Sequence, residues 1–444
     1  MKLFQKLLVA STAMSLITPL AAQASDTLNL EEMNNYSRSS SKIQRFDSKT
    51  FINEVSEDIA KIKGRLDGLE AQQNVFEAGA FSDTTTMDGK AIFDLGVLDY
   101  SETESSAEAV KFSYSYTLNL NSSFTGDDNL YVRLKTGNHS GWMTSSDHGG
   151  YLSSAKGNSD ALKVDKIWYE FPVGENNTVW VGPKIENYYM HGTSPSIYKP
   201  ITKQFTLGGN GNAYGASTNT GAGWAYKADN GFAISSNVVS KSTNSVSSAS
   251  ESGCVAKTAS NSYSNTGILT DCSKTSWATQ IGITKPQYSA SLMVNQKYNG
   301  WSDGYFHTQY ADDAVSGGDG NHTAVGLRGW WRPVETGTAT PSISLGYDTT
   351  QYSGVPAGTS DNSDAWFVGL TWQDMITADD RIGIAFGQPT KHDDETTDPF
   401  AYELYYSYKA NDSVTITPSV FGGQDREGDS EDVFGALLQT TFKF

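Results

Sequence analysis

The sequence predicts an all-β transmembrane barrel of about sixteen antiparallel strands, preceded by a short N-terminal coiled-coil helix. The observation that leads to this fold is the last twelve residues, 433–444, which separate into two faces when taken alternately, as a strand requires. One face is apolar with aromatic residues near both ends, and the other is small and polar, as in outer-membrane strands. The apolar face comprises Phe434, Ala436, Leu438, Thr440, Phe442 and Phe444, and the other Gly435, Leu437, Gln439, Thr441 and Lys443.

The closing edge strand of a soluble β-sandwich would alternate in the same way, so alternation alone does not distinguish the two folds. Only 37% of the residues are hydrophobic, although the chain contains 42 Gly, 23 Tyr, 19 Phe and 10 Trp. A large conventional core needs more apolar residues, whereas a barrel with a wet interior needs only one apolar face per strand. The composition therefore favours the barrel. The net charge of −18 argues against nucleic acid as a partner.

Residues 1–24 predict a secretory signal peptide. Lys2 and Lys6 precede an apolar run that reaches Ala22, and Ala22-Gln23-Ala24 has the form of an A-x-A cleavage site. No later apolar stretch reaches the roughly 20 residues that a membrane-spanning helix needs. The mature chain is therefore expected to be either soluble or a membrane-spanning barrel.

Export also bears on the two cysteines, Cys254 and Cys272, which lie in one polar stretch rich in Ser, Asn and Thr. A local disulfide between them is the expected state of an exported protein. A metal or redox pair has less support, because neither a C-x-x-C spacing nor a nearby His is present.

Residues 25–50 are polar and are predicted to be disordered, and residues 51–77 then predict a periplasmic coiled coil. Apolar residues recur at spacings of three and four, the heptad pattern of a helix that packs against partner helices. β-Branched residues at both core positions favour three or more strands, so we expect a homotrimer. One amphipathic helix lying on the domain is the alternative. The seam comprises Ile52, Val55, Ile59, Ile62, Leu66, Leu69 and Phe76.

The barrel domain is expected over residues 88–444, and its clearest strand is 111–124. There, aromatic residues and Leu alternate with Lys, Ser, Thr and Asn. Similar alternation predicts sixteen strands, at 91–98, 111–124, 129–136, 164–172, 177–183, 221–228, 231–239, 276–284, 288–298, 323–332, 341–348, 365–373, 380–387, 400–408, 413–421 and 433–444.

The connections between these strands favour a barrel over a sandwich. Short turns, such as those at 125–128, 174–177 and 285–287, alternate with long polar loops, such as 137–163 and 240–275. Bacterial outer-membrane barrels have short periplasmic turns and long external loops, whereas a sandwich has no reason for such alternation. Outer-membrane lipid is therefore an expected partner.

Five stretches of the sequence carry a family resemblance: IAKIKGRLDGLEAQQ, FSDTTTMDGKAIFDLG, SSFTGDDNLYVRLKTGN, VDKIWYEFPVGENNTVWVGPKIENYYM and GAGWAYKADNGF. They resemble the cyanobacterial outer-membrane porins that are related to carbohydrate-selective porins. The resemblance implies a trimeric, sixteen-stranded channel for passive diffusion of small hydrophilic solutes and ions. Carbohydrates or inorganic anions are candidate solutes, and the N-terminal segment is expected to lie in the periplasm. Members usually carry a wall-binding S-layer-homology module, which is not recognisable here, so attachment to the cell wall is doubtful.

Strand parity predicts which side chains face the lumen. Basic residues outnumber acidic ones there, with Asp94, Glu170 and Glu403 among the acids, and basic rings favour anions. The alternative is a set of isolated charges, each solvated in a wide pore. The predicted pore-lining residues are Lys111, Arg133, Lys135, Lys166, Glu170, Lys297, Arg328 and Lys443.

The loop at 184–220 is predicted to fold into the barrel and constrict it, and Arg133, Lys135, Lys199 and Lys203 are predicted to form the selectivity region. Aromatic faces beside charged groups could guide a sugar, or could equally be the packing of the loop against the wall. The loop residues are Lys184, Glu186, Tyr188, Tyr189, His191, Tyr198, Lys199 and Lys203.

No cofactor, metal or enzymatic activity is predicted. The sequence has six scattered histidines and no H-E-x-x-H or G-x-S-x-G motif, and the acidic segment 312–322 does not follow the EF-hand pattern. Two other functions stay open, a substrate-specific channel for sugar or iron and a structural envelope tether. Saturable flux would distinguish a specific channel from a general pore.

Overall fold

The computed structural model describes residues 80–82, 84–101, 109–145, 149–214, 218–241, 268, 273–301, 320–426 and 431–444. These residues belong to one compact unit, Gln72–Phe444. The predicted signal peptide, polar segment and coiled coil lie outside the described residues, as do Cys254 and Cys272.

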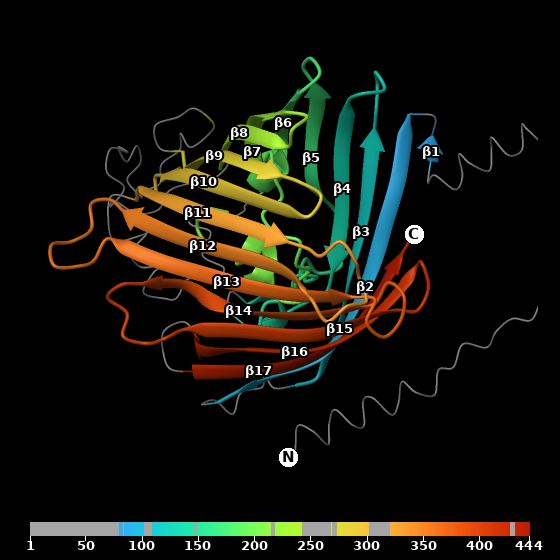
Figure 1. Cartoon of the computed structure of the whole chain (residues 1–444), viewed down its shortest axis with the longest axis vertical. Coiled ribbons are helices and arrows are strands. Elements are labelled where there is room, and N and C mark those ends of the chain that lie inside the picture. Colours follow the sequence, from blue (N-terminus) through green and yellow to red (C-terminus); the bar gives the residue numbers. More distant parts are fainter. Residues whose placement is uncertain are drawn as a thin grey trace, which may run out of the picture. The chain divides into compact units, whose positions relative to one another are not determined.

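The described strands form a closed antiparallel barrel (Figure 1). Each strand from β2 to β17 pairs with the next along the chain, and β17 pairs with β2, which makes a ring of sixteen strands in this part of the chain. The predicted barrel of about sixteen strands is confirmed. The bounds are β1 Ala80–Ser82, β2 Thr85–Tyr100, β3 Lys111–Ser122, β4 Asn129–Gly137, β5 Lys163–Pro172, β6 Asn177–Glu186, β7 Thr218–Lys227, β8 Phe232–Ser240, β9 Thr275–Thr284, β10 Tyr288–Tyr298, β11 His322–Trp331, β12 Ser342–Tyr352, β13 Asn362–Gln373, β14 Arg381–His392, β15 Phe400–Lys409, β16 Val414–Arg426 and β17 Glu431–Lys443.

The two faces of each strand differ in chemistry, as the alternating sequence requires. On the outer face of β3, Phe112 is 64% exposed, while Ser113 and Ser115 on the inner face are buried. At the closing seam, Phe442 of β17 packs against Phe93 of β2 on the outside, with 5.2 Å between ring centroids. An apolar, aromatic surface therefore faces outward, where lipid would contact it.

The connections differ at the two ends of the barrel because antiparallel strands place alternate connections at opposite ends. One end carries turns such as 173–176, 228–231 and 285–287, and the longest connection at this end is 332–341. The other end carries long connections, including 138–162 and 187–217. This is the alternation of short turns and long loops that the sequence predicts.

Short 3₁₀ helices lie in the two long connections just named. They are η3 (Gly141–Thr144) in loop 138–162, and η4 (Asn187–Met190) and η5 (Lys203–Gly208) in loop 187–217. None of the helices in the described ranges is long and apolar enough to cross a membrane.

A buried core lies on the inner wall, where both loops pack against inward-facing side chains. Trp142, Met143 and Leu152 come from loop 138–162, and Ile201 and Phe205 come from loop 187–217. These residues share one cluster with strand residues of the inner face: Leu98, Phe367, Ala385, Ala401, Tyr405, Phe421, Val433 and Leu437. The loops therefore fill part of the barrel interior (Figure 1).

Candidate functional site

Loop 187–217 follows the inner wall of the barrel and is hydrogen-bonded to one strand after another. Its backbone meets β8 at Gly192, β9 at Thr193, β11 at Ser194 and β12 at Ile197, over distances of 2.9–3.2 Å. The partners are the inward-facing side chains of Ser235, Gln280, Trp330 and Ser344. A chain that returned outside the barrel could not reach these groups, so the loop narrows the lumen.

Glu403 of β15 is the strongest single anchor of this loop. Its carboxylate accepts hydrogen bonds from Tyr198 Oη (2.9 Å) and from the backbone amides of Ile201 (3.0 Å) and Thr202 (2.8 Å). Thr202 Oγ1 donates a fourth bond of 2.6 Å. Glu403 is only 1% exposed, so the carboxylate that parity places inside serves to hold the loop and does not face the pore water.

A second anchor lies where the loop returns towards β7. The Arg328 guanidinium forms an ion pair with Asp348 (2.6 Å) and donates through Nε to the Leu207 carbonyl oxygen (2.9 Å). Lys297 Nζ donates to the Asn212 carbonyl oxygen at 2.6 Å. A Cβ at Gly346 would collide with the backbone of the loop, so glycine permits this close approach.

These anchors correct the sequence-based list of pore-lining residues. Lys166, Lys297 and Arg328 lie on the inner face, but their exposures are 4%, 0% and 3%, respectively. Strand parity cannot foresee this, because it places a side chain inside the barrel without saying what covers it. Three of the predicted pore cations are therefore loop anchors.

Lys184 and Glu186 differ from the prediction in another way, because they are the last residues of β6 and not part of the loop. A register shift between Gly182 and Ile185 breaks the alternation of this strand. Lys184 is placed opposite Ile167, and its Nζ donates to the Val164 carbonyl oxygen (2.7 Å). Lys184 therefore lies on the outer face and does not contribute to a constriction.

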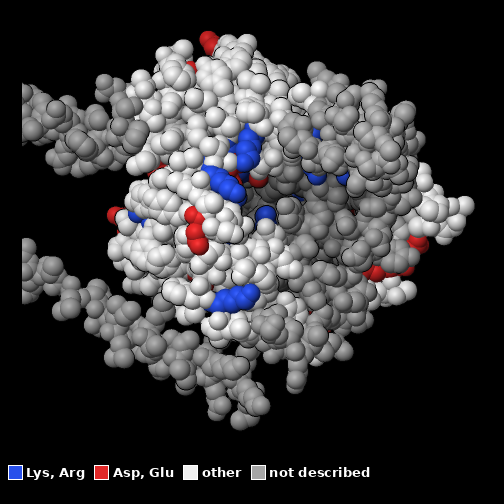
Figure 2. Space-filling model, turned by 180° about the vertical axis from the view of Figure 1, so that it is seen from behind, with Lys and Arg blue, Asp and Glu red and all other residues white. Residues whose placement is uncertain are grey.

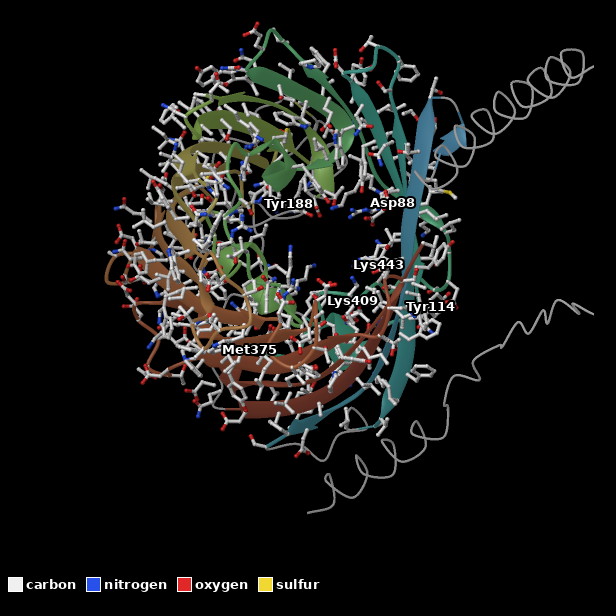
Figure 3. All side chains as sticks on the ribbon, turned by 45° about the vertical axis from the view of Figure 1, so that its right-hand side comes forward. Asp88, Tyr114, Tyr188, Met375, Lys409 and Lys443 are labelled. Carbon is white, nitrogen blue, oxygen red and sulfur yellow. The ribbon has the colours of Figure 1, made fainter. Side chains whose placement is uncertain are left out.

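Tyr188 and Tyr189 pack on the wall beside Lys166. The ring centroid of Tyr189 lies 4.6 Å from that of Trp168, and the centroids of the two tyrosines lie 4.5 Å apart. Lys166 Nζ forms an ion pair with Glu186 and lies over the Tyr189 ring, 4.7 Å from its centroid. The buried part of this cluster is packing between loop and wall, while Tyr188 borders the open middle of the barrel in Figure 3.

Two other predicted residues prove to be internal partners. Glu170 lies on the inner face of β5 and accepts a hydrogen bond from Trp180 Nε1 at 2.7 Å. Burial lowers the pKa of His191, in the loop, to about 3, so its imidazole is neutral at ordinary pH. Glu170 is therefore engaged by a tryptophan of the wall, and His191 adds no positive charge to the lumen.

The inward folding of loop 138–162 was not foreseen, and Asp94 of β2 holds it in place. The Asp94 carboxylate contacts His139 Nε2 (2.8 Å) and accepts a hydrogen bond from Ser154 Oγ (2.7 Å). Gln439 of β17 donates to its other oxygen at 2.9 Å. Backbone bonds then join the loops, Ser153 N to Ile201 O (2.8 Å) and Lys203 N to Tyr151 O (2.7 Å). The polar and aromatic composition of this loop gave no periodic signal that could have revealed its position.

A second group of cations lies on the part of the inner wall that the anchors leave open. Lys443, Lys90, Thr117 and Lys135 are successive register partners across β17, β2, β3 and β4. Arg133 lies two residues from Lys135 on the same face of β4. We call Lys90, Arg133, Lys135 and Lys443 the basic row.

The basic row faces open space. Figure 2 shows Lys and Arg side chains around the hollow in the middle of the barrel, and Lys443 borders the same opening in Figure 3. Lys90 and Lys443 are exposed, and Arg133 and Lys135 are partly exposed. Lys199, from the loop, is also exposed. Its positive charge repels that of Lys90, as do the charges of Arg133 and Lys443.

The inner wall thus carries cations of two kinds. Lys156, Lys166 and Arg328 are paired with Asp165, Glu186 and Asp348, respectively. Within the described ranges, none of the basic-row residues forms an ion pair with a carboxylate. Lys111 lies at the other end of the inner face, where its Nζ donates to the Ser140 carbonyl oxygen (3.1 Å). No cluster of metal-ligating side chains occurs in the described part of the chain.

A closed sixteen-stranded barrel with an apolar outer surface, a charged lumen and a loop folded inside has the architecture of an outer-membrane porin. The chain belongs to the carbohydrate-selective porin, OprB family, whose model matches residues 47–444. The family predicted from the five sequence stretches is therefore confirmed, and so is the assignment to the outer membrane.

The chain is also similar to individual proteins and solved structures. The chain is 25% identical over 423 residues to the uncharacterized protein alr4550 of Nostoc sp., covering 88% of this chain and 71% of that protein. The structure of Pseudomonas putida OprB superposes with a TM-score of 0.56 at 11% identity, covering 85% of this chain and 97% of that one. At this identity the likeness shows the fold alone. A variant of the Rh. blastica porin gives a TM-score of 0.48 at 10% identity, covering 81% and 100%.

Proposed function

We propose that this porin lets small hydrophilic solutes and ions diffuse passively through a water-filled lumen that favours anions over cations. The observation that carries the proposal is the basic row, whose cations have no carboxylate partner among the described residues. A wall of unpaired Lys and Arg lowers the electrostatic barrier for anions and raises it for cations. The net charge of −18 does not oppose this, because the row acts on an ion at close range.

The test is the reversal potential of the purified protein in a planar bilayer under a potassium chloride gradient. Arg133, Lys135, Lys199 and Lys203 are replaced together by Gln. One unit charge about 4 Å from a solvated ion is worth about 1 kcal/mol in a water-like medium, so we expect chloride preference to fall several-fold or to reverse.

A matched variant replaces four cations at the barrel ends, Lys227, Lys274, Lys285 and Arg332, and changes the net charge equally. We expect it to keep most of the chloride preference. An unchanged preference in the first variant, or an equal loss in both, would contradict the proposal.

Carbohydrates are the second candidate class, because the family bears their name and Tyr188 borders the opening. A partly exposed aromatic ring beside charged groups can stack on the apolar face of a sugar. Tyr131 and Trp168 are only 8% and 4% exposed, however, and are not available for stacking. Glucose flux measured in liposomes distinguishes the two candidates, since a specific sugar site gives saturable flux and a general pore gives flux proportional to concentration.

A further inference from the structure

We propose that Lys90 and Lys443, with Arg133, Lys135 and Lys199 beside them, form a binding site for a phosphate group inside the lumen. The ligand is a doubly charged tetrahedral oxyanion, either inorganic phosphate or the phosphate of a small phosphorylated solute. This inference rests on the proposed anion preference and names the class of anion that the lumen retains.

The first argument is the register. Lys443 and Lys90 are directly opposite each other on the two strands that close the barrel. Side chains in such pairs start about 4.5–5.5 Å apart at Cβ, so the two ammonium groups can converge on one ligand. Lys135 lies on the same row with only Thr117 between, so a third cation joins from β4.

The second argument is the absence of neutralising partners. Like charges placed directly opposite destabilise a sheet, and elsewhere on this wall the cations are held by Asp165, Glu186 and Asp348. The charged groups that act on Lys90 are Arg133, Lys443 and Lys199, all of them positive. An anion between these groups would offset their repulsion.

Two acids lie near the row and do not cancel it. Asp88 Oδ1 accepts a hydrogen bond from Asn119 Nδ2 at 2.7 Å, and Asn119 Oδ1 in turn accepts one from Arg133 Nε at 3.1 Å. Asp165 attracts the charge of Lys135 but already forms an ion pair with Lys156 at 2.6 Å. Asp88 keeps its negative charge, but it is one carboxylate beside the four cations of the basic row, so the balance around Lys90 and Lys443 stays positive.

The third argument is the shape of the ligand. Chloride presents one centre of charge, whereas phosphate presents several oxygens that separate ammonium and guanidinium groups can contact at once. Arg133 uses Nε for Asn119, which leaves its other N–H groups for an oxyanion. The charge of Lys199, on loop 187–217, adds to the positive potential at Lys90. A dianion therefore gains more here than chloride does.

The experiment measures single-channel chloride current while inorganic phosphate, glucose 6-phosphate or glucose is added. We expect both phosphates, but not neutral glucose, to reduce the chloride current with saturation. Replacing Lys90 and Lys443 by Gln should raise the half-blocking phosphate concentration about tenfold, which corresponds to about 1.4 kcal/mol in binding free energy.

The matched control is Lys111→Gln with Lys227→Gln, which removes the same charge from inward-facing positions at other places along the wall. It should change the half-blocking concentration far less than the Lys90 and Lys443 double variant. The arginine variants of Lys90 and Lys443 should restore block, because they restore the charges.

Chloride preference without any block by either phosphate would overturn the site and leave the proposed porin function intact. Block that survives in the Lys90 and Lys443 variant would also overturn it. Block by glucose 6-phosphate alone, lost in that variant, would support a site for a phosphorylated solute. If the unmodified protein showed no chloride preference, the proposed function itself would be contradicted.

Discussion

Individual charged residues on the inner wall have roles that depend on what covers them. Arg328, Lys297 and Lys443 all lie on the inner face, yet the first two are buried against loop 187–217 and the third borders open space. Burial turns a cation into a hydrogen-bonding anchor, since a desolvated charge must be paired. Exposure leaves the charge free to act on a passing ion.

Lys199 gives the lumen a pH dependence that can be measured. Although the Lys199 side chain reaches solvent, the surrounding inner wall partly desolvates its ammonium group and lowers its pKa below the ordinary value, and the nearby Arg381 lowers it further. A lowered pKa means that the ammonium group loses its proton at a lower pH than other lysines. We therefore expect chloride preference to start falling at a pH lower than about 10.4, the ordinary pKa of lysine. Reversal potentials measured between about pH 7 and pH 10 check this.

Two variants test how much of this fall comes from Lys199. Lys199→Gln should make the fall in chloride preference smaller, and Arg381→Gln should move part of the fall to higher pH because a repelling charge has gone. Lys227→Gln should leave the fall unchanged. A fall of the same size without Lys199 would assign the titration to other groups, such as the lysines of the basic row.

Two loops, and not the strands, determine how much of the barrel interior stays open. Loop 187–217 is fastened through Glu403, and loop 138–162 is fastened through Asp94. The loops then pair with each other between Ser153 and Ile201 and share one apolar cluster. Their positions are therefore coupled, so loosening one anchor should affect both.

Replacing Glu403 by Gln tests this coupling. The amide can accept fewer hydrogen bonds than the carboxylate and brings N–H groups that have no acceptor here. Hydrogen bonds to charged groups are worth about 1.5–3 kcal/mol each, so the loss should exceed about 2 kcal/mol. We expect larger and noisier single-channel conductance, and faster proteolysis within residues 138–162 as well as 187–217.

Glu335→Gln is the matched control, because Glu335 is exposed in the turn after β11. It should leave conductance and proteolysis unchanged. Loosening of loop 187–217 alone, with loop 138–162 still protected, would show that the two loops are held independently.

The barrel as a whole is closed by the pairing of β17 with β2, which joins the end of the chain to the start of the described fold. This closure leaves no strand edge unpaired in the ring, as a membrane-spanning sheet requires. It also brings Lys443 and Lys90 together, although they are far apart in the sequence. The basic row therefore exists only because the ring closes.

The heptad seam predicts that three copies assemble. Replacing Ile59 and Ile62 by Gln removes two large apolar contacts per chain, each worth about 1.5–3 kcal/mol when buried. We expect the mass of the detergent-solubilised protein to fall from three copies towards one, or the trimer to separate at a lower temperature. Glu57→Gln with Lys61→Gln changes positions off the seam and should not affect the mass. A trimer equally stable in both variants would exclude the seam as the source of assembly.

The strands and their faces could be predicted from the sequence because a strand has a fixed period of two, and lipid requires one apolar face. The bounds predicted for β10 (Tyr288–Tyr298) agree with the structure, and those for β8 (Phe232–Ser240) differ by one residue. The predicted lining does not include Lys90, which lies one residue before the predicted strand 91–98, or Arg381, the second residue of the predicted strand 380–387.

The contents of the lumen could not be predicted in this way, because they depend on contacts between residues that are distant in sequence and follow no local period. Glu403 meets Thr202, and Asp94 meets Ser154, only when the loops have folded inward. The bulge that sends Lys184 to the outer face is likewise settled by pairing with both neighbouring strands. Local alternation therefore determined the barrel, whereas long-range contacts determined which of its charges remain free in the pore.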